Sequence, residues 1–289
     1  MKNGKIAFIG GDKRMFCCAE ALSEMGFECA LYGFDRISDR ANSTRTPSIR
    51  DCLLNAQALV LPVPLSRDGI SISCDGVGIT LAEVLAAVEA ETPIFAGAVS
   101  EKATAVAKQY NRTITDFLLD ESLCEKNAYL TAEGAVGLAM RSIDGAVFGK
   151  RALVTGYGRI AAYTARLLKA LGADVTVFAR REISRTKACL DGHKAIGQKG
   201  LCDAISNTDI VFNTVPARIF GEAEAAHFSS RQVYIELASS PFGIDKALAD
   251  RHNLEITDGS SLPSRYCPVA AGGYIAEYLA KQFEGMGII

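Results

Sequence analysis

Residues 150–181 read KRALVTGYGRIAAYTARLLKALGADVTVFARR, a stretch in which the hydrophobic spacing changes twice. An apolar run enters a turn at Gly156, and after Gly158 the apolar residues return at helical intervals. A second apolar run follows at 174–178. With Ala161 as the third small residue, the turn matches G-x-G-x-x-[G/A] between a strand and an amphipathic helix. The stretch therefore predicts the first βαβ unit of a dinucleotide-binding domain.

The residue types in this turn suit a phosphate ligand. Gly156 permits the tight turn, Gly158 leaves the backbone bare where a pyrophosphate approaches, and Ala161 lets the helix pack closely on the sheet. The helix N-terminus offers free N–H groups and the positive end of its dipole to the phosphates. The predicted coenzyme contacts are Gly156, Tyr157, Gly158, Arg159 and Ile160. The alternative is a tight turn that binds no ligand.

The end of the second strand bears on the choice of coenzyme. NAD sites usually carry Asp or Glu there for the ribose 2′-hydroxyl, whereas NADP sites tend to offer Arg. This chain has Arg180 and Arg181, with no acidic residue before Glu182. A guanidinium binds a 2′-phosphate bidentately, so both arginines are predicted coenzyme contacts and NADP is the predicted cofactor. The alternative is that both are solvated surface charges.

Further loops are predicted at the same sheet edge, because the carboxyl ends of parallel strands lie together. A strand over 208–212 opens onto a turn that is predicted to lie beside the nicotinamide ring. The residues of this turn are Asn213, Thr214, Val215 and Pro216. A strand over 232–237 leads into a loop containing Ser240, a predicted substrate contact, and another strand spans 254–257.

The first half of the chain also alternates strands and helices. Strands are predicted at 5–9, 28–32, 57–61, 93–96 and 113–115, and helices at 80–90 and 100–109. The loop G-G-D-K-R at 10–14 lacks the third small position, so it is not predicted to bind a dinucleotide. Either Asp12 simply caps the next helix, or Asp12 and Arg14 face a ligand at the sheet edge. Arg67 lies in a later loop at a strand's carboxyl end.

These patterns predict an α/β protein with two Rossmann-like, doubly wound domains and an interdomain cleft. The N-terminal substrate-side domain is predicted at 1–126, and the C-terminal helix, 268–289, returns to complete it. A helix rich in small residues connects the domains at 127–148, and the NADP-binding domain covers 149–267. Glu133 lies on the small face of this connector, either exposed or aimed into the cleft.

Composition excludes several classes of protein. The chain has 289 residues, 49% of them hydrophobic and 22% charged, with a net charge of −2, which argues against nucleic acid or a membrane surface as partner. The N-terminus leads directly into a strand, which indicates a cytoplasmic protein. Nine cysteines and three histidines occur without metal-binding spacing, so no metal site is predicted.

A combination of motifs spans the whole chain. They are I-G-G-D-K-R at 9–14, L-P-V-P at 61–64, T-A-E-G-A at 131–135, G-Y-G-R-I at 156–160 with F-A-R-R at 178–181, N-T-V-P at 213–216 and L-P-S-R at 262–265. In this combination the sequence resembles the dipicolinate synthase A-subunit family of spore-forming bacteria. The G-G-D-x-R start, L-P-V-P and T-A-E-G-A are the discriminating motifs.

The resemblance implies a reaction at a branch of the lysine and diaminopimelate pathway. The cyclic substrate 4-hydroxy-tetrahydrodipicolinate loses water, and the resulting dihydropyridine dicarboxylate gives a hydride to NADP to form pyridine-2,6-dicarboxylate. The resemblance also implies a hetero-oligomer with the flavoprotein-like B subunit and action in the mother-cell cytoplasm during sporulation. A homo-oligomer of this chain is predicted as well.

This chemistry places demands on the residues. A dianionic substrate calls for arginine, and Arg14 and Arg67 are preferred over Arg141, Arg218 and Arg265. Loss of the hydroxyl needs proton transfer, for which Glu133 and Asp12 are the predicted catalytic residues. Two alternatives remain open: another NADP-dependent two-domain dehydrogenase acting on a hydroxy or amino acid, and a non-catalytic subunit that senses NADP.

Overall fold

The computed structural model describes residues 4–37, 42–74, 78–143 and 145–288. Contacts divide the chain into two compact units, and each is treated by itself below. The N-terminal unit comprises Met1–Lys126 together with Pro263–Ile289, and the C-terminal unit comprises Asn127–Leu262. The N-terminal unit is therefore built from both ends of the chain, whereas the C-terminal unit is one continuous segment.

The N-terminal unit contains a six-stranded sheet in the order β3-β2-β1-β4-β5-β6, in which every pair of neighbours is parallel. Its strands are β1 (Lys5–Ile9), β2 (Glu28–Tyr32), β3 (Thr44–Arg45), β4 (Ala58–Val60), β5 (Ile94–Ala96) and β6 (Ile114–Asp116). Its helices include α1 (Lys13–Glu24), α2 (Ile49–Leu53), α3 (Leu81–Ala87), α4 (Glu101–Gln109) and α12 (Pro268–Met286), with a 3₁₀ turn at Phe117–Leu119. The central strands are apolar and buried because helices cover both faces of a parallel sheet.

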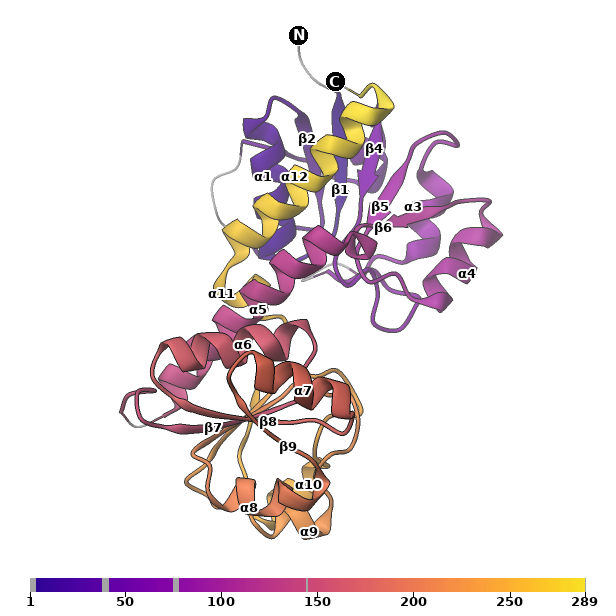
Figure 1. Ribbon diagram of the computed structural model, residues 1–289. Helices are drawn as coiled ribbons and strands as arrows, with labels where there is room; N and C mark the ends of the chain where they lie inside the picture. The colour runs from indigo at the N-terminus through magenta and orange to yellow at the C-terminus, as the bar shows by residue number, and fades with distance from the viewer. Residues whose placement is uncertain (1–3, 38–41, 75–77, 144, 289) are drawn as a thin grey trace. The chain divides into compact units, whose positions relative to one another are not determined.

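The C-terminal helix α12 is part of the N-terminal core, as predicted. It lies beside α1 in Figure 1. The packing is close at Gly272, where an added Cβ would come within 2.6 Å of the Arg14 carbonyl oxygen and the Cys18 nitrogen. Further along α12, the fully buried Phe283 ring meets Phe27 and Phe95 edge to face.

The C-terminal unit repeats the same architecture. Its sheet runs β12-β11-β10-β7-β8-β9, again with all neighbours parallel. The strands are β7 (Arg151–Thr155), β8 (Asp174–Phe178), β9 (Lys194–Ile196), β10 (Ile210–Asn213), β11 (Val233–Glu236) and β12 (Ile256–Asp258). The helices include α6 (Arg159–Ala170), α7 (Glu182–Leu190), α8 (Leu201–Ser206), α9 (Glu222–Ala225) and α10 (Lys246–Arg251), with a 3₁₀ turn at Gln198–Gly200.

Both sheets follow the Rossmann strand order. In each, the strand that comes first in sequence lies at the centre, and the order reverses between it and the fourth strand. These reversals lie between β1 and β4 and between β7 and β10. Ligands of doubly wound folds bind outside the carboxyl ends of the strands at such points. The two-domain α/β class predicted from the sequence is confirmed.

The bounds of one predicted helix need correction. The helix expected from Asn127 begins at Glu121 and ends at Ser142 (α5), and α11 (Leu262–Tyr266) follows the last strand as a short separate helix. The buried face of α6 consists of Ala161, Thr164, Ala165 and Leu168.

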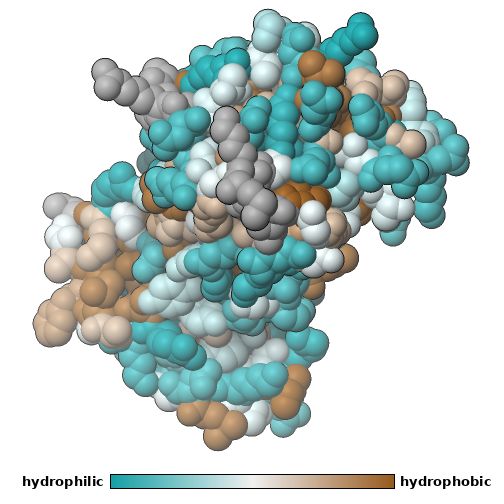
Figure 2. All heavy atoms as spheres, turned by 90° about the horizontal axis from the view of Figure 1, so that it is seen from above, coloured by the Kyte–Doolittle hydropathy of each residue, from teal (hydrophilic) through white to brown (hydrophobic). Residues whose placement is uncertain are grey.

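One face of the molecule can be followed in Figure 2. Figure 2 shows mainly hydrophilic side chains on the visible face, with apolar residues gathered in limited areas. Phe148, on the C-terminal unit, is among the most exposed large hydrophobic residues at 78%. Within the described ranges, no helix has the length and apolar content that a membrane crossing requires.

Candidate dinucleotide site

The fingerprint turn connects β7 to α6 in the C-terminal unit. Gly156 has φ = 83°, and a Cβ there would come within 2.8 Å of Thr214 Oγ1 and 2.9 Å of Val215 Cγ2. Gly158 is the N-cap of α6. Within the described part of the chain, no side chain caps this helix and no atom lies within 4 Å of a Cβ built on Gly158. The turn is packed on one side and open at the helix N-terminus, so the residues present fit a pyrophosphate group.

Tyr157, between the two glycines, is anchored away from the turn. Its hydroxyl donates to Asp191 Oδ2 at 2.5 Å, and its ring meets the His193 ring edge to face at 6.2 Å between centroids. Burial and the Asp191 hydrogen bond raise the pKa of Tyr157 above its usual value. Burial, followed by the charge of Lys169, lowers the pKa of His193. Tyr157 therefore stays a protonated donor that ties the turn to the segment after α7.

The basic segment after β8 presents two exposed arginines. Arg180 donates from Nη2 to the Arg218 carbonyl oxygen at 2.9 Å, and Arg181 is the exposed N-cap of α7. Arg185 holds the segment from behind, donating from Nη1 to the carbonyl oxygens of Ala179 at 2.9 Å and Arg180 at 2.6 Å. The segment thus has a fixed backbone and guanidinium groups at the surface.

The turn after β10 is fixed by a buried amide. Asn213 is fully buried, and its Oδ1 accepts from Thr155 Oγ1 at 2.5 Å. Its Nδ2 donates to Glu236 Oε1 at 2.6 Å and to the Val215 carbonyl oxygen at 3.1 Å. The Asn213 side chain is thus committed to the domain interior, and any ligand at this turn would meet its neighbours Thr214, Val215 and Pro216.

Glu236, the last residue of β11, was passed over in the sequence. It is only 5% exposed, and its carboxylate holds the following loop through the amides of Ala238 at 3.0 Å and Gly243 at 2.8 Å. Tyr234 donates to Glu236 Oε2 at 3.1 Å, and burial raises the Tyr234 pKa so that this donor keeps its proton. The available signal was a single acid ending the apolar strand V-Y-I-E. Ser240 lies exposed in the loop that Glu236 holds.

In the N-terminal unit, Asp12 and Arg14 bind each other. Asp12 caps α1 by accepting from the Arg14 amide at 3.0 Å, and its Oδ2 lies 2.9 Å from Arg14 Nη2. The same nitrogen donates to the Val63 carbonyl oxygen at 2.5 Å, and the Arg14 side chain is 7% exposed. Of the two sequence interpretations of Asp12, the structure shows the cap. A substrate contact by Arg14 would need this buried pair to rearrange.

Arg67 and Glu133 are both exposed. Arg67 lies in a loop shaped by Asp68, whose carboxylate accepts from the amides of Ile70 and Ser71 at 2.8 Å, and these bonds lower the pKa of Asp68. Glu133 lies on α5 in the C-terminal unit. Among the predicted substrate or catalytic residues, Asp12, Arg14 and Arg67 thus belong to the N-terminal unit, whereas Glu133 and Ser240 belong to the C-terminal unit.

Comparison with known proteins matches this architecture. Residues 5–118 match the family described as the N-terminal domain of the dipicolinate synthase A subunit. The dipicolinate synthase A subunit of Bacillus subtilis (strain 168) is 26% identical over 281 residues, which are 96% of this chain and 95% of that relative. The chain is thus similar to the dipicolinate synthase A subunit along nearly its whole length, and its first 118 residues include the match to that family's N-terminal domain.

Solved structures of dipicolinate synthase A subunits share the fold. The crystal structure from Bacillus subtilis is 25% identical with a TM-score of 0.82 and covers 99% of this chain and 98% of that chain. The structure from Bacillus halodurans is 24% identical with a TM-score of 0.85 and covers 97% of this chain and 98% of that chain.

The second half of this chain matches a dehydrogenase domain. Residues 125–251 match the NAD-binding domain family of D-isomer-specific 2-hydroxyacid dehydrogenases. The fingerprint turn lies inside this match. The C-terminal unit is therefore a nicotinamide dinucleotide-binding domain of dehydrogenase type, and the chain is a dehydrogenase-like subunit.

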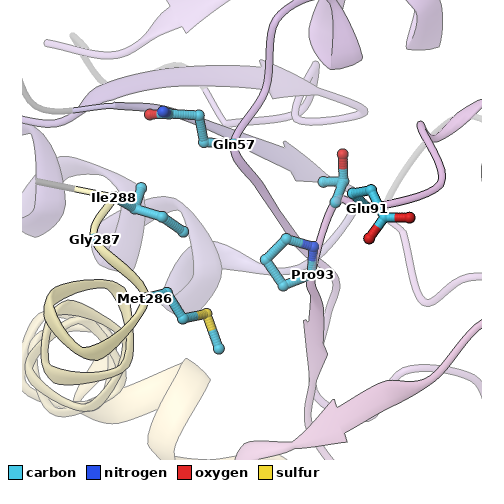
Figure 3. A pocket seen from close by; sticks show the side chains of 7 residues that line it. Gln57, Glu91, Pro93, Met286, Gly287 and Ile288 are labelled. Carbon is cyan, nitrogen blue, oxygen red and sulfur yellow. The ribbon is translucent and has the colours of Figure 1, made fainter.

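A hollow of about 480 Å³ lies in the N-terminal unit, at the sheet edge where strands β4 and β5 begin. It is lined by residues that precede β4 and β5 and by the C-terminal turn, and Figure 3 shows Met286 and Ile288 opposite Pro93. None of the predicted site residues lines this hollow. Among the described residues, no group of three or more His, Cys, Asp or Glu side chains could hold a metal ion.

Proposed function

We propose that this chain is the catalytic subunit of a dipicolinate synthase that uses NADP. The substrate 4-hydroxy-tetrahydrodipicolinate loses its 4-hydroxyl and a ring proton as water, which gives a dihydropyridine dicarboxylate. This intermediate transfers a hydride to NADP⁺ and releases a proton, so that dipicolinate and NADPH are formed. The reaction would take place in the mother-cell cytoplasm during sporulation.

The observation that carries the proposal is full-length similarity to the dipicolinate synthase A subunit, combined with an open helix N-terminus at Gly158. The coenzyme supplies the hydride acceptor when bound. The chain's own residues would hold it. The amides at the start of α6 would bind the pyrophosphate, and the turn after Asn213 would line the nicotinamide side.

The preference for NADP over NAD rests on the segment after β8. Arg181 is exposed, and the backbone beside it is held by Arg185. A 2′-phosphate there would gain charge-assisted hydrogen bonds. Between the end of β8 and Glu182 the chain has no carboxylate that could bind a free 2′-hydroxyl. Arg180 would have to exchange its bond to the Arg218 carbonyl oxygen for one to the phosphate.

For the dicarboxylate substrate, Arg67 is the exposed arginine of the preferred pair and would bind one carboxylate. Ser240 would add a hydrogen bond. Glu133 would act as the proton-transferring group, since it is exposed on α5. Arg14 and Asp12 would serve only after their mutual ion pair opens.

The decisive experiment combines binding with turnover. Purified protein is titrated with NADP⁺ and NAD⁺ by calorimetry. It is then given freshly generated 4-hydroxy-tetrahydrodipicolinate while nicotinamide and pyridine dicarboxylate absorbance are followed. The proposal expects NADP⁺ binding and equal amounts of NADPH and dipicolinate. Binding without turnover would identify a coenzyme sensor, and turnover only of other hydroxy or amino acids would identify a different dehydrogenase.

We also propose that the working assembly is a homo-oligomer that binds a flavoprotein-like B subunit. The name of the Bacillus subtilis relative designates it as one subunit, and the exposed Phe148 offers apolar area for a protein contact. Light scattering of the purified chain, by itself and mixed with the B subunit, measures both associations. A monomer in both cases contradicts them.

A further inference from the structure

We propose that Glu236 is a positioning residue for the nicotinamide end of the coenzyme. This inference rests on the proposed function, because it assumes that a nicotinamide coenzyme binds at the Gly156–Gly158 turn. Glu236 would not touch the coenzyme. It would fix the two loops that the nicotinamide end meets.

Three polar residues stand in register across three neighbouring strands. Thr155 is the Cα partner of Asn213, and Asn213 is the Cα partner of Glu236. Each is the last residue of its strand, so together they form a row at the carboxyl edge of the sheet. All three are at least 95% buried, and hydrogen bonds of 2.5 and 2.6 Å join them.

The Glu236 carboxylate holds the loop after its own strand through backbone amides. Oε1 accepts from Ala238 and Oε2 accepts from Gly243, so both ends of the loop are held by one side chain. Gly243 packs so tightly that an added Cβ would come within 2.6 Å of the Tyr234 hydroxyl and 2.7 Å of Asn213 Cγ. The loop that carries Ser240 therefore has little freedom at its two ends.

Asn213 carries the constraint to the coenzyme turn. Glu236 and Thr155 bind opposite ends of the Asn213 amide, which fixes its orientation. Asn213 in turn binds the Val215 carbonyl oxygen, and Thr214 and Val215 lie against Gly156, where a Cβ would meet them at 2.8 and 2.9 Å. One buried carboxylate thus sets the loop after β11 and, through Asn213, the turn after β10.

The position of the network explains why it would affect only one end of the coenzyme. In Rossmann domains the pyrophosphate crosses the fingerprint turn, and the acid or arginine that reads the adenosine ribose follows the second strand, here β8. The Glu236 network lies on the other side of β7, at β10 and β11. It should therefore act on the nicotinamide half and leave the adenosine half unaffected.

The test compares two ligands on two matched variants. Glu236→Gln keeps the shape but replaces one oxygen by an NH₂ group, so at least one loop amide loses its acceptor. Tyr234→Phe removes a donor to the same carboxylate from an equally buried position and leaves both loop amides and Asn213 bound. Dissociation constants are measured by calorimetry for NADPH and for 2′-phospho-ADP-ribose, which lacks nicotinamide. If wild-type protein prefers NADH, then NADH and ADP-ribose are used.

We expect Glu236→Gln to weaken NADPH binding about tenfold and to change 2′-phospho-ADP-ribose binding by less than about twofold, because a lost acceptor displaces the loops. Tyr234→Phe should lower the melting temperature while changing neither dissociation constant.

Equal effects of Glu236→Gln on the binding of both ligands, or the same pattern of changes in both variants, would overturn the positioning role of Glu236. If Glu236→Gln does not fold, Thr155→Val decides: weaker NADPH binding with unchanged fragment binding supports the role, and parallel changes reject it. Wild-type protein that binds neither coenzyme refutes the proposed function itself.

Discussion

The two units begin with the same elements and use them differently. In each, a five-residue central strand enters a glycine-containing turn and then a 12-residue helix, β1 to α1 in one and β7 to α6 in the other. At α1 the helix N-terminus is occupied by the carboxylate of Asp12, which also pairs with Arg14. At α6 the N-cap is Gly158, and no described side chain makes a cap hydrogen bond there.

This difference determines which helix N-terminus can bind an anionic ligand. We call the α1 end sealed because the Asp12 carboxylate already occupies it. A helix N-terminus attracts negative charge in either case. In the N-terminal unit the chain supplies that charge itself and binds the pair to the Val63 carbonyl oxygen of a neighbouring loop. In the C-terminal unit no described side chain caps α6, so a ligand could supply the negative charge. We therefore expect a dinucleotide at α6 and not at α1, although both units share the Rossmann strand order.

Placing a charge at the open helix end should have the largest effect. Gly158→Asp puts a carboxylate where the pyrophosphate would sit, and like charges about 4 Å apart near a surface repel by about 4 kcal/mol. Calorimetry should show coenzyme affinity lowered about a thousandfold. Gly285→Asp, which adds the same charge at an exposed glycine of α12, should bind coenzyme like wild type. Undiminished binding by Gly158→Asp would place the phosphates elsewhere.

Opening the sealed helix end should destabilise the protein without affecting the coenzyme. Asp12→Ala removes the α1 cap and leaves the buried Arg14 without its carboxylate, which should lower the free energy of unfolding by about 3 kcal/mol. Asp245→Ala is the matched control because Asp245 caps α10 and pairs with Arg218, which is 46% exposed. It should cost about 1 kcal/mol. Urea denaturation measures both, and equal losses would contradict a buried ion pair.

The exposed arginines sharpen the comparison from the ligand side. Replacing both Arg180 and Arg181 by Gln should lower NADPH affinity about tenfold, through loss of charge-assisted hydrogen bonds to the 2′-phosphate. Arg181→Gln alone should account for most of the loss, since Arg180 is already bound to the Arg218 carbonyl oxygen. NADH affinity serves as the internal control. A parallel fall for both coenzymes would show that the arginines do not discriminate between them.

The smallest expected effect is a pH dependence confined to the C-terminal unit. Burial lowers the His193 pKa below its usual 6.5, so the unfolded chain takes up a proton at a higher pH than the folded one. Stability should therefore fall as pH drops through 6.5 towards the folded pKa, by at most about 1.4 kcal/mol per pH unit. His193→Asn should flatten the profile between neutral and mildly acidic pH in urea denaturation. Superimposable profiles would show that His193 does not titrate differently on folding.

The sequence was informative where the decisive interactions are local. Strand, glycine turn and helix at Gly156–Gly158 follow from neighbouring residues, and so does the strand alternation of both sheets. The fate of Asp12 and Arg14 was not settled by the sequence, because the third partner is a carbonyl oxygen from the loop after β4. Glu236 was missed although Asn213 ends the adjacent strand in the same way, since only the sheet register shows that the two face each other.

The placement of Phe283 has a consequence for biosynthesis. This ring packs between Phe27 and Phe95 in the core of the N-terminal unit, yet it is translated only after the whole segment 127–262. The segment 127–262 contains all of its own strands and can complete its fold earlier in translation. We expect the segment 127–262 of the nascent chain to fold first. Residues 1–126 can complete their hydrophobic core only after α12 has been synthesised.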